Sequence, residues 1–193
     1  MRIISGSAKG RKLFPPLSRS KEIRPTSDRA REALFNIIGT RIIDCCVLDL
    51  FAGTGAFGCE ALSRGAARVC FIDHSKVSLD LIQKNSALVP DGREKSWVIK
   101  TDLSRGFNQT CLTRLESCMF DLVFADPPYL TELSNKILSA LDNCSVLSAD
   151  PLIIIEERKN FTPPEHLNKL YLKDSRSYGE SSFYFYGYAA FQP

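Results

Sequence analysis

The sequence is poor in the residues that build metal sites and disulfide frameworks. It contains only two histidines, and its seven cysteines include no C-x-x-C pair. An odd number of cysteines, several of them within apolar runs, is typical of reduced core residues in a cytosolic chain. We therefore expect no metal site, no disulfide and a cytoplasmic protein.

Long hydrophobic runs are also missing. No apolar run approaches the roughly 20 residues that span a bilayer, and residues 1–5 lack the apolar centre of a signal peptide. The 193 residues, of which 44% are hydrophobic, have the composition of a soluble globular protein with a large core. These features predict a protein that does not contact a membrane.

Acidic residues are scarce in the first part of the chain. Residues 1–32 contain nine Lys or Arg and three Asp or Glu, whereas the remaining residues contain 16 and 19. A basic arm on a mildly acidic body indicates contact with a polyanion, and a solvated charged surface is the alternative. The candidate polyanion-binding residues are Arg2, Lys9, Arg11, Lys12, Arg24 and Arg29.

The basic arm has the pattern of a folded extension. Residues 2–5 and 10–14 read as two short strands around a turn, which predicts a basic hairpin. Apolar residues between 30 and 38 recur at helical spacing, with Arg29 and Arg31 at the start or on the polar side of that helix. We expect a hairpin-and-helix extension over residues 1–40 and a second domain over residues 41–193.

Strands and helices alternate after residue 40. Buried strands are expected at residues 45–50, 68–72, 97–100, 122–125 and 152–156, with helices between them. Residues 170–172 and 183–186 predict a terminal antiparallel hairpin, and the Pro-containing link at 159–168 is a poor helix. The pattern predicts an α/β fold with a doubly wound, mostly parallel, seven-stranded sheet.

A glycine-rich loop follows the first of these strands. Residues 53–58 match G-x-G-x-x-G, in which glycines let the backbone turn tightly and approach a ligand. Asp73 ends the next strand, at the spacing of a carboxylate that binds two ribose hydroxyls. Taken alone, this pattern fits NAD as well as any other nucleotide cofactor.

Two carboxylates argue for a cofactor without phosphate. Asp49 enters the glycine loop and would place negative charge beside a pyrophosphate. S-adenosylmethionine carries an ammonium that suits Asp49, a carboxylate that suits the helix N-terminus and a ribose that suits Asp73. Asp102, at the end of a later strand, suits the adenine amine, although a plain surface position is the alternative.

The strand at 122–125 runs into Asp126-Pro127-Pro128-Tyr129. The two prolines make the chain leave the sheet extended, at the edge where α/β sheets bind ligands. The Asp126 carboxylate and the Pro127 carbonyl can each accept one hydrogen of a planar exocyclic amine, so that its nitrogen can pyramidalise and attack an electrophile. Tyr129 can stack on the nucleobase that carries this amine. The alternative is a Pro-rich turn with no chemical role.

Several blocks of sequence closely resemble the bacterial 16S ribosomal RNA guanine-N2 methyltransferases of the RsmD type, which are class I S-adenosylmethionine-dependent enzymes. These blocks are residues 1–6, 10–13, 24–29, 31–36, 49–55, 60–66 and 126–129. The resemblance reaches from residue 1 to near Gly179, and the N-terminal blocks are more specific than Asp-Pro-Pro-Tyr, which other amine methyltransferases share.

The resemblance implies a Rossmann-like methyltransferase sheet that acts on the N2 amine of one guanine, position 966 in the family, in 16S rRNA. It implies action on 16S rRNA within a small-subunit particle or assembly intermediate, with the base taken out of its stack. We also expect a monomer. It assigns the catalytic loop to Asp126, Pro127, Pro128 and Tyr129. It assigns the cofactor site to Asp49, Phe51, Ala52, Gly53, Thr54, Gly55, Asp73, His74, Asp102 and Leu103.

Two other functions fit parts of the pattern. A DNA or RNA adenine-N6 methyltransferase would use the same tip, but 193 residues leave no room for a sizeable target-recognition domain. A non-catalytic RNA-binding assembly factor on the same fold would not need an intact Asp126 tip and glycine loop. The identity of the methylated nucleoside distinguishes the first alternative from a guanine-N2 methyltransferase. Binding of S-adenosylmethionine distinguishes a methyltransferase from the non-catalytic factor.

Overall fold

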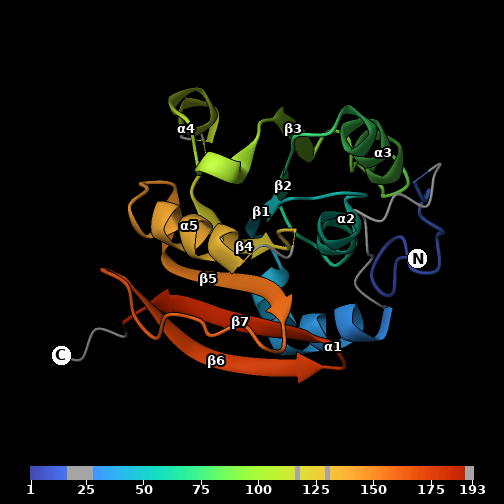
Figure 1. Cartoon of the computed structure of the whole chain (residues 1–193). Coiled ribbons are helices and arrows are strands. Elements are labelled where there is room, and N and C mark those ends of the chain that lie inside the picture. Colours follow the sequence, from blue (N-terminus) through green and yellow to red (C-terminus); the bar gives the residue numbers. More distant parts are fainter. Residues whose placement is uncertain (17–27, 116–117, 129–130, 190–193) are drawn as a thin grey trace.

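Seven strands form one sheet in the order β3-β2-β1-β4-β5-β7-β6 (Figure 1). The computed structural model describes residues 1–16, 28–115, 118–128 and 131–189. The strands are β1 (Cys46–Leu50), β2 (Arg68–Asp73), β3 (Ser96–Lys100), β4 (Phe120–Ala125), β5 (Leu147–Arg158), β6 (Leu170–Tyr178) and β7 (Ser181–Tyr188). The first five are parallel, and β7 pairs antiparallel with both β5 and β6.

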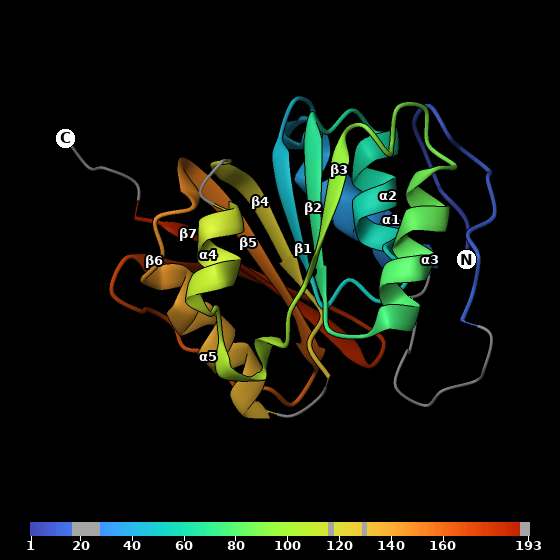
Figure 2. The ribbon, with the colours of Figure 1, turned by 90° about the horizontal axis from the view of Figure 1, so that it is seen from above.

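Helices cover both faces of the sheet. They are α1 (Asp28–Ile38), α2 (Ala56–Ser63), α3 (Lys76–Ser86), α4 (Gln109–Leu115) and α5 (Thr131–Asp142), with short 3₁₀ helices η1 (Gly39–Ile42) and η2 (Leu103–Arg105). Figure 2 shows α1, α2 and α3 on one face and α4 and α5 on the other. The predicted doubly wound, mostly parallel sheet is therefore confirmed.

The central strand β4 is buried on both faces, as its apolar run predicted. Leu122 and Phe124 join the core under α1 and α2, while Val123 and Ala125 join the core under α5. The Phe124 ring stacks on Phe57 of α2 with 4.0 Å between the ring centroids. This two-sided burial holds β4 in the sheet up to Ala125, so Asp126 is the first residue beyond the strand.

Strand β5 is longer than expected. It runs from Leu147 to Arg158 and includes Pro151, which the sequence placed before the strand. The pairing with β4 shifts register between Phe120 and Leu122, so the extra residues join through an irregular segment. The link at 159–168 contains no helix, in agreement with the expectation.

The N-terminal segment does not form the two predicted strands. An isolated antiparallel bridge between Arg2 and Lys12 joins its two arms, where the Ile3 N–H donates to the Arg11 carbonyl at 2.9 Å and the Gly10 N–H to the Ile3 carbonyl at 2.8 Å. A side chain of α2 binds the segment as well: Glu60 accepts the N–H groups of Ile4 and Ser5 at 2.7 and 3.0 Å. The chain therefore turns back on itself as the predicted hairpin does, but with a single bridge in place of two regular strands.

Arg31 is buried, contrary to the expectation that it would lie on the polar side of α1. Its side chain is 2% exposed, donates to the Arg2 carbonyl at 2.7 Å and pairs with Asp28 at 2.9 Å. Ile37, expected on the buried stripe, is 41% exposed. The buried face of α1 is thus rotated by one residue, and Arg31 connects the helix to the N-terminal segment.

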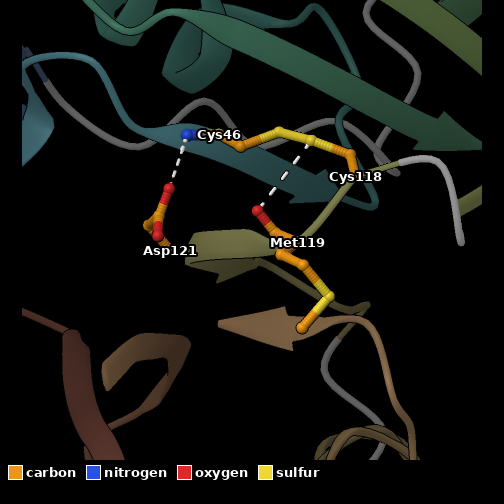
Figure 3. Close-up of a disulfide and its surroundings, with 4 residues drawn as sticks. All are labelled: Cys46, Cys118, Met119 and Asp121. Atoms are coloured by element: carbon orange, nitrogen blue, oxygen red, sulfur yellow. Dashed lines mark hydrogen bonds between the residues drawn. A yellow bond between two sulfur atoms is a disulfide. The ribbon is translucent and has the colours of Figure 1, made fainter. Parts of the chain in front are cut away.

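Two cysteines form a disulfide, so the prediction that all seven are reduced was wrong. Cys46 at the start of β1 is bonded to Cys118, just before β4 (Figure 3). The neighbouring Asp121 carboxylate accepts the Cys46 N–H at 2.9 Å. The disulfide lies at the edge of the sheet where the parallel strands β1 and β4 begin. The remaining five cysteines are free, and four of them are buried.

Metal-binding clusters and membrane spans were searched for in the residues that the structure describes. No group of three or more His, Cys, Asp or Glu side chains there could hold a metal ion. None of the helices in those ranges is long and apolar enough to cross a membrane.

Candidate active site

The predicted site residues gather at the carboxyl edge of the parallel strands. Leu50 at the end of β1 pairs with Ile72 of β2 and with Ala125 of β4, and Ala125 pairs with Ile155 of β5. In Figure 2 the arrowheads of β1, β2, β4 and β5 lie at the same edge. The loops after these strands therefore face a common space, as expected for a ligand site in an open α/β sheet.

The glycine loop turns sharply between β1 and α2. Gly53 and Gly55 have φ angles of +54° and +73°, and Phe51 has +56°, which is unusual for a residue with a side chain. The Ala52 N–H donates to the Ile72 carbonyl at 3.0 Å, which ties the loop to β2. The loop is held in a conformation that side chains disfavour, and such strain clusters at ligand-binding sites.

The third glycine of the motif has a packing role. A Cβ atom on Gly58 would lie 2.2 Å from the Phe71 ring and 2.8 Å from the Val69 side chain. Only glycine allows α2 to pack this closely on β2. Thr54, between the other two glycines, is buried, and its carbonyl accepts the Asn85 amide at 2.8 Å. The loop therefore rests on α3 as well as on the sheet.

Asp49 is buried beneath α2. Its side chain is 1% exposed, and one oxygen accepts the Gly58 N–H at 3.0 Å, so Asp49 uses one donor of the helix N-terminus predicted for a ligand carboxylate. Burial raises the pKa of the Asp49 carboxyl well above its usual value; the Gly58 hydrogen bond opposes this shift and the negative Asp73 adds to it. A cationic ligand nearby would stabilise the ionised form of Asp49.

Asp73 supports the glycine loop directly. One carboxylate oxygen accepts the Gly53 N–H at 2.8 Å, and the other accepts the Ser75 N–H at 2.8 Å. The residue is 7% exposed, whereas the neighbouring His74 ring is largely exposed and lies 3.7 Å from Asp73. Each carboxylate oxygen has a further lone pair, so Asp73 can still accept hydroxyl hydrogens of a ribose.

Asp102 and Leu103 follow β3 on the other side of Asp73. Asp102 is exposed and caps η2, accepting the Ser104 N–H at 2.8 Å, while Leu103 is buried. This hydrogen bond lowers the pKa of the Asp102 carboxyl, with smaller contributions from His74 and Arg105. The structure thus brings Asp102 to the same edge as a surface acid with a lowered pKa, and its contact with an adenine amine stays a prediction.

Asp126 lies at the tip of β4, where the sequence placed it. The side chain is half-buried, Pro127 is buried and Pro128 is exposed. Burial raises the pKa of the Asp126 carboxyl well above its usual value, and the negative charges of Glu156, Asp49 and Glu157 raise it further. Tyr129, the fourth residue of the predicted catalytic loop, lies outside the described residues.

Two site residues were missed from the sequence. Glu156 and Glu157 end the apolar run of β5 and are 1% and 2% exposed. Glu157 accepts the Ser134 hydroxyl of α5 at 2.7 Å, on the other face of the sheet. The available signal was two acidic residues at the end of a buried strand, which is rare unless they have a partner or a role.

Most of the predicted RNA-binding residues are on the surface. Arg2, Lys9, Arg11, Lys12 and Arg29 are exposed, and Arg24 lies outside the described residues. Arg11 has a structural contact as well, because its guanidinium donates to the Leu88 carbonyl at the end of α3. The other exposed cations are the better probes of a nucleic-acid contact.

The geometry fits a ribose-containing ligand with a cationic group. The backbone of the glycine loop can lie close to a ligand, and the buried Asp73 lies beside this loop. A nearby positive charge would stabilise the ionised form of the buried Asp49. Asp126 follows the adjacent strand and adds a hydrogen-bond acceptor. Together, these groups can hold a charged nucleoside derivative and present it to a second molecule bound against Asp126.

Sequence comparison identifies relatives over nearly the whole chain. The family described as "Conserved hypothetical protein 95" matches residues 1–187. "Ribosomal RNA small subunit methyltransferase D" of Haemophilus influenzae is 37% identical over 164 residues, which cover 83% of this chain and 80% of the relative. "Putative rRNA methyltransferase YlbH" of Bacillus subtilis is 32% identical over 179 residues, which cover 93% and 94%.

Solved structures share the fold. "Putative methyltransferase yhhF from Escherichia coli" superposes with a TM-score of 0.80 at 30% sequence identity, covering 98% of each chain. An RNA methyltransferase from Salinibacter ruber in complex with S-adenosyl-L-homocysteine, at 13% identity and a TM-score of 0.64, has the same fold. The sheet is therefore that of the class I methyltransferases.

Proposed function

The chain belongs to the "Conserved hypothetical protein 95" family, and from this premise we propose that it methylates the exocyclic N2 amine of a guanine in 16S ribosomal RNA. The methyltransferase relatives support S-adenosylmethionine as the cofactor and ribosomal RNA as the substrate class. The observation that carries the proposal is the position of Asp126 at the strand end next to the glycine loop.

The residues at the carboxyl edge of the sheet would each bind a different part of the cofactor. Asp73 would hold the ribose hydroxyls, residues 51–55 would lie along the cofactor backbone, and Asp49 would face its positive charge. When bound, S-adenosylmethionine supplies a methyl group on a sulfonium and leaves as a neutral thioether. Asp102 is the candidate for the adenine amine because it is exposed at the same edge and the Ser104 hydrogen bond lowers its pKa.

The acceptor amine needs two hydrogen-bond acceptors. The Asp126 carboxylate would take one hydrogen, and the Pro127 carbonyl the other, because proline prevents the local backbone from folding back on that carbonyl. Holding both hydrogens frees the nitrogen lone pair, and the carboxylate stabilises the positive charge that develops on nitrogen. These residues position the acceptor amine, and positioning supplies most of the acceleration in such a transfer.

The identity of the target nucleotide follows from the family resemblance. Guanine 966 of 16S rRNA is the proposed target, within a small-subunit particle or assembly intermediate. A guanine in a loop would leave its stack at low energetic cost. We propose that the protein acts as a monomer.

A methylation assay on naked 16S rRNA and on small-subunit particles tests the proposed function. We expect N2-methylguanosine as the product nucleoside by mass spectrometry, with particles as the better substrate. N6-methyladenosine in the digest would replace the proposal with the adenine-N6 alternative. If the protein neither binds labelled S-adenosylmethionine nor produces a methylated nucleoside, it is a binding factor on this fold.

The basic N-terminal segment should make RNA binding sensitive to salt. Lys9 and Lys12 are exposed on this segment, and each phosphate contact contributes about one to the slope of log affinity against log salt. Replacing both by Gln should lower affinity for RNA and reduce that slope, as measured by filter binding across a salt series.

The matched control for this experiment is Lys136→Gln. Lys136 is exposed on α5, on the opposite face of the sheet, and pairs with Glu132 at 3.3 Å. Loss of one exposed cation there should leave the slope unchanged. Equal slopes for the wild-type protein and the Lys9/Lys12 variant would contradict the proposed role of the segment.

A further inference from the structure

Three acidic side chains occupy the carboxyl ends of three adjacent strands. Asp49 lies on β1, Asp126 follows β4 and Glu156 lies on β5. Ala125 and Ile155 are paired in the β4–β5 register, so Asp126 and Glu156 are the next residues of neighbouring strands. Asp126 is half-buried, while Asp49 and Glu156 are each 1% exposed. The sequence motif explains Asp126 but gives no reason for a second buried acid beside it.

The alternation of side chains along the strands places Glu156 on the same face as Asp126. Phe124 and Ile154 share one core, under α1 and α2, and Ala125 and Ile155 share the other, under α5. With a period of two, Glu156 returns to the face of Phe124 and Ile154, and the same alternation carried one residue past the end of β4 places Asp126 there. Glu157 points to the opposite face, where it accepts the Ser134 hydroxyl. Glu156 is therefore the cross-strand neighbour of Asp126, and Glu157 is not.

We propose that Glu156 is a positioning residue that keeps Asp126 ready to receive the proton that the amine loses on methylation. The inference rests on the proposed function. In the reaction, a nitrogen–carbon bond forms, the sulfur–carbon bond breaks with its electron pair left on sulfur, and the nitrogen carries one positive charge. Loss of one N–H proton neutralises the product amine. That proton moves to the Asp126 carboxylate, and from there to water.

The charge of Glu156 makes Asp126 a stronger base than an isolated aspartate. Among the described residues, the groups that raise the pKa of Asp126 electrostatically are Glu156 first, then Asp49 and Glu157, and all three are acidic. A carboxylate with a raised pKa holds a transferred proton better, which favours deprotonation of the amine. A like charge on the neighbouring strand is the physical means, because two close carboxylates resist simultaneous ionisation.

The pH dependence of methylation tests this role. Asp126 must be ionised to accept hydrogens, so turnover should rise with pH through its raised pKa. Replacing Glu156 by Gln removes a negative charge, which lowers the pKa of Asp126 and should move the acidic limb of the pH–rate profile to lower pH by about one unit or more. Glu156→Asp keeps the charge and should keep the limb near its wild-type position.

Glu157→Gln is the matched control, since it removes the same charge from the next residue on the other face of the sheet. The acidic limb of the pH–rate profile should move clearly less in Glu157→Gln than in Glu156→Gln. An acidic limb that stays in place in Glu156→Gln, or that moves equally in both variants, overturns the proposal. A loss of folded enzyme that is the same at every pH lowers the whole profile and leaves the limb in place.

A second measurement needs neither cofactor nor RNA. The carboxyl carbon resonance of Asp126 can be followed by NMR in protein labelled with carboxyl-¹³C aspartate and assigned by its loss in Asp126→Asn. We expect its titration midpoint to fall in Glu156→Gln and to change less in Glu157→Gln. An unchanged midpoint overturns the proposal even if the variant is inactive. Failure of the wild-type protein to methylate RNA would instead overturn the proposed function.

Discussion

Asp126→Ala should reduce methyl transfer by about 10²- to 10³-fold or more, while S-adenosylmethionine affinity stays close to that of the wild-type protein. The carboxylate is expected to bind the acceptor amine and its developing charge, whereas the cofactor contacts come from other strands. Asp126→Asn keeps the volume and one acceptor oxygen but not the charge, so it should also be strongly impaired. Turnover with labelled donor and calorimetric binding measure the two effects separately.

The loss of activity should not come from unfolding. The pKa of Asp126 in the folded state lies well above its usual value because of burial and neighbouring acids. The folded state therefore holds a proton that the unfolded state has released, and stability falls as pH rises from the unfolded towards the folded pKa. A neutral Asn removes this penalty at neutral pH, so Asp126→Asn should unfold at the same temperature as the wild-type protein or higher.

Asp121→Asn is the control on the same strand. Asp121 lies at the other end of β4, where it accepts the Cys46 N–H. Its replacement should leave the turnover of the folded enzyme unchanged. Wild-type turnover in both Asp126 variants would remove the proposed mechanism, whatever the product nucleoside.

Gly6→Ala should destabilise the protein far more than Gly10→Ala. Both glycines have positive φ angles, +82° and +85°. A Cβ on Gly6 would lie 1.7 Å from the Ser63 carbonyl oxygen, whereas a Cβ on Gly10 would meet nothing within 4 Å. We expect Gly10→Ala to lower the free energy of unfolding by about 1–2 kcal/mol, the cost of a left-handed side-chain residue. Gly6→Ala adds a backbone clash, for a total of about 2–5 kcal/mol.

Urea unfolding of the two variants measures this difference. The larger effect follows from the close docking of the N-terminal segment on α2, where the Ser7 N–H donates to the Ser63 carbonyl at 2.7 Å. Equal losses of stability in the two variants would mean that the segment can move away from α2 without cost. RNA affinity measured on the same proteins would then tell whether docking matters for binding.

Much of the fold was predictable because its signals are local. The apolar run of β4 ends before Asp126 and two prolines, a pattern that favours a buried strand followed by an extended turn. The third glycine of G-x-G-x-x-G indicated close packing of helix on strand, and Gly58 is packed against Phe71. Alternating helices and strands then left few possible topologies.

The errors arose where partners lie far apart in the sequence. Residues 30, 33, 34, 37 and 38 and residues 30, 31, 34, 35 and 38 are overlapping helical stripes, and the charge of Arg31 favours the first. Burial of Arg31 depends on the Arg2 carbonyl, 29 residues away. Likewise, the Cys46–Cys118 bond spans 72 residues, and Glu156 has significance only because β5 lies beside β4. Tertiary pairing of this kind is not encoded in any local pattern.

Helix α2 makes a different set of contacts at each of its two ends. Its eight residues measure about 12 Å. Its first turn holds Asp49 through Gly58, and its last turn holds the first residues of the chain through Glu60 and Ser63. Trimming the N-terminus to simplify the protein would therefore uncover a buried glutamate and loosen the wall of the ligand site. The segment proposed to bind RNA and the site proposed to transfer the methyl group are therefore connected through one short helix.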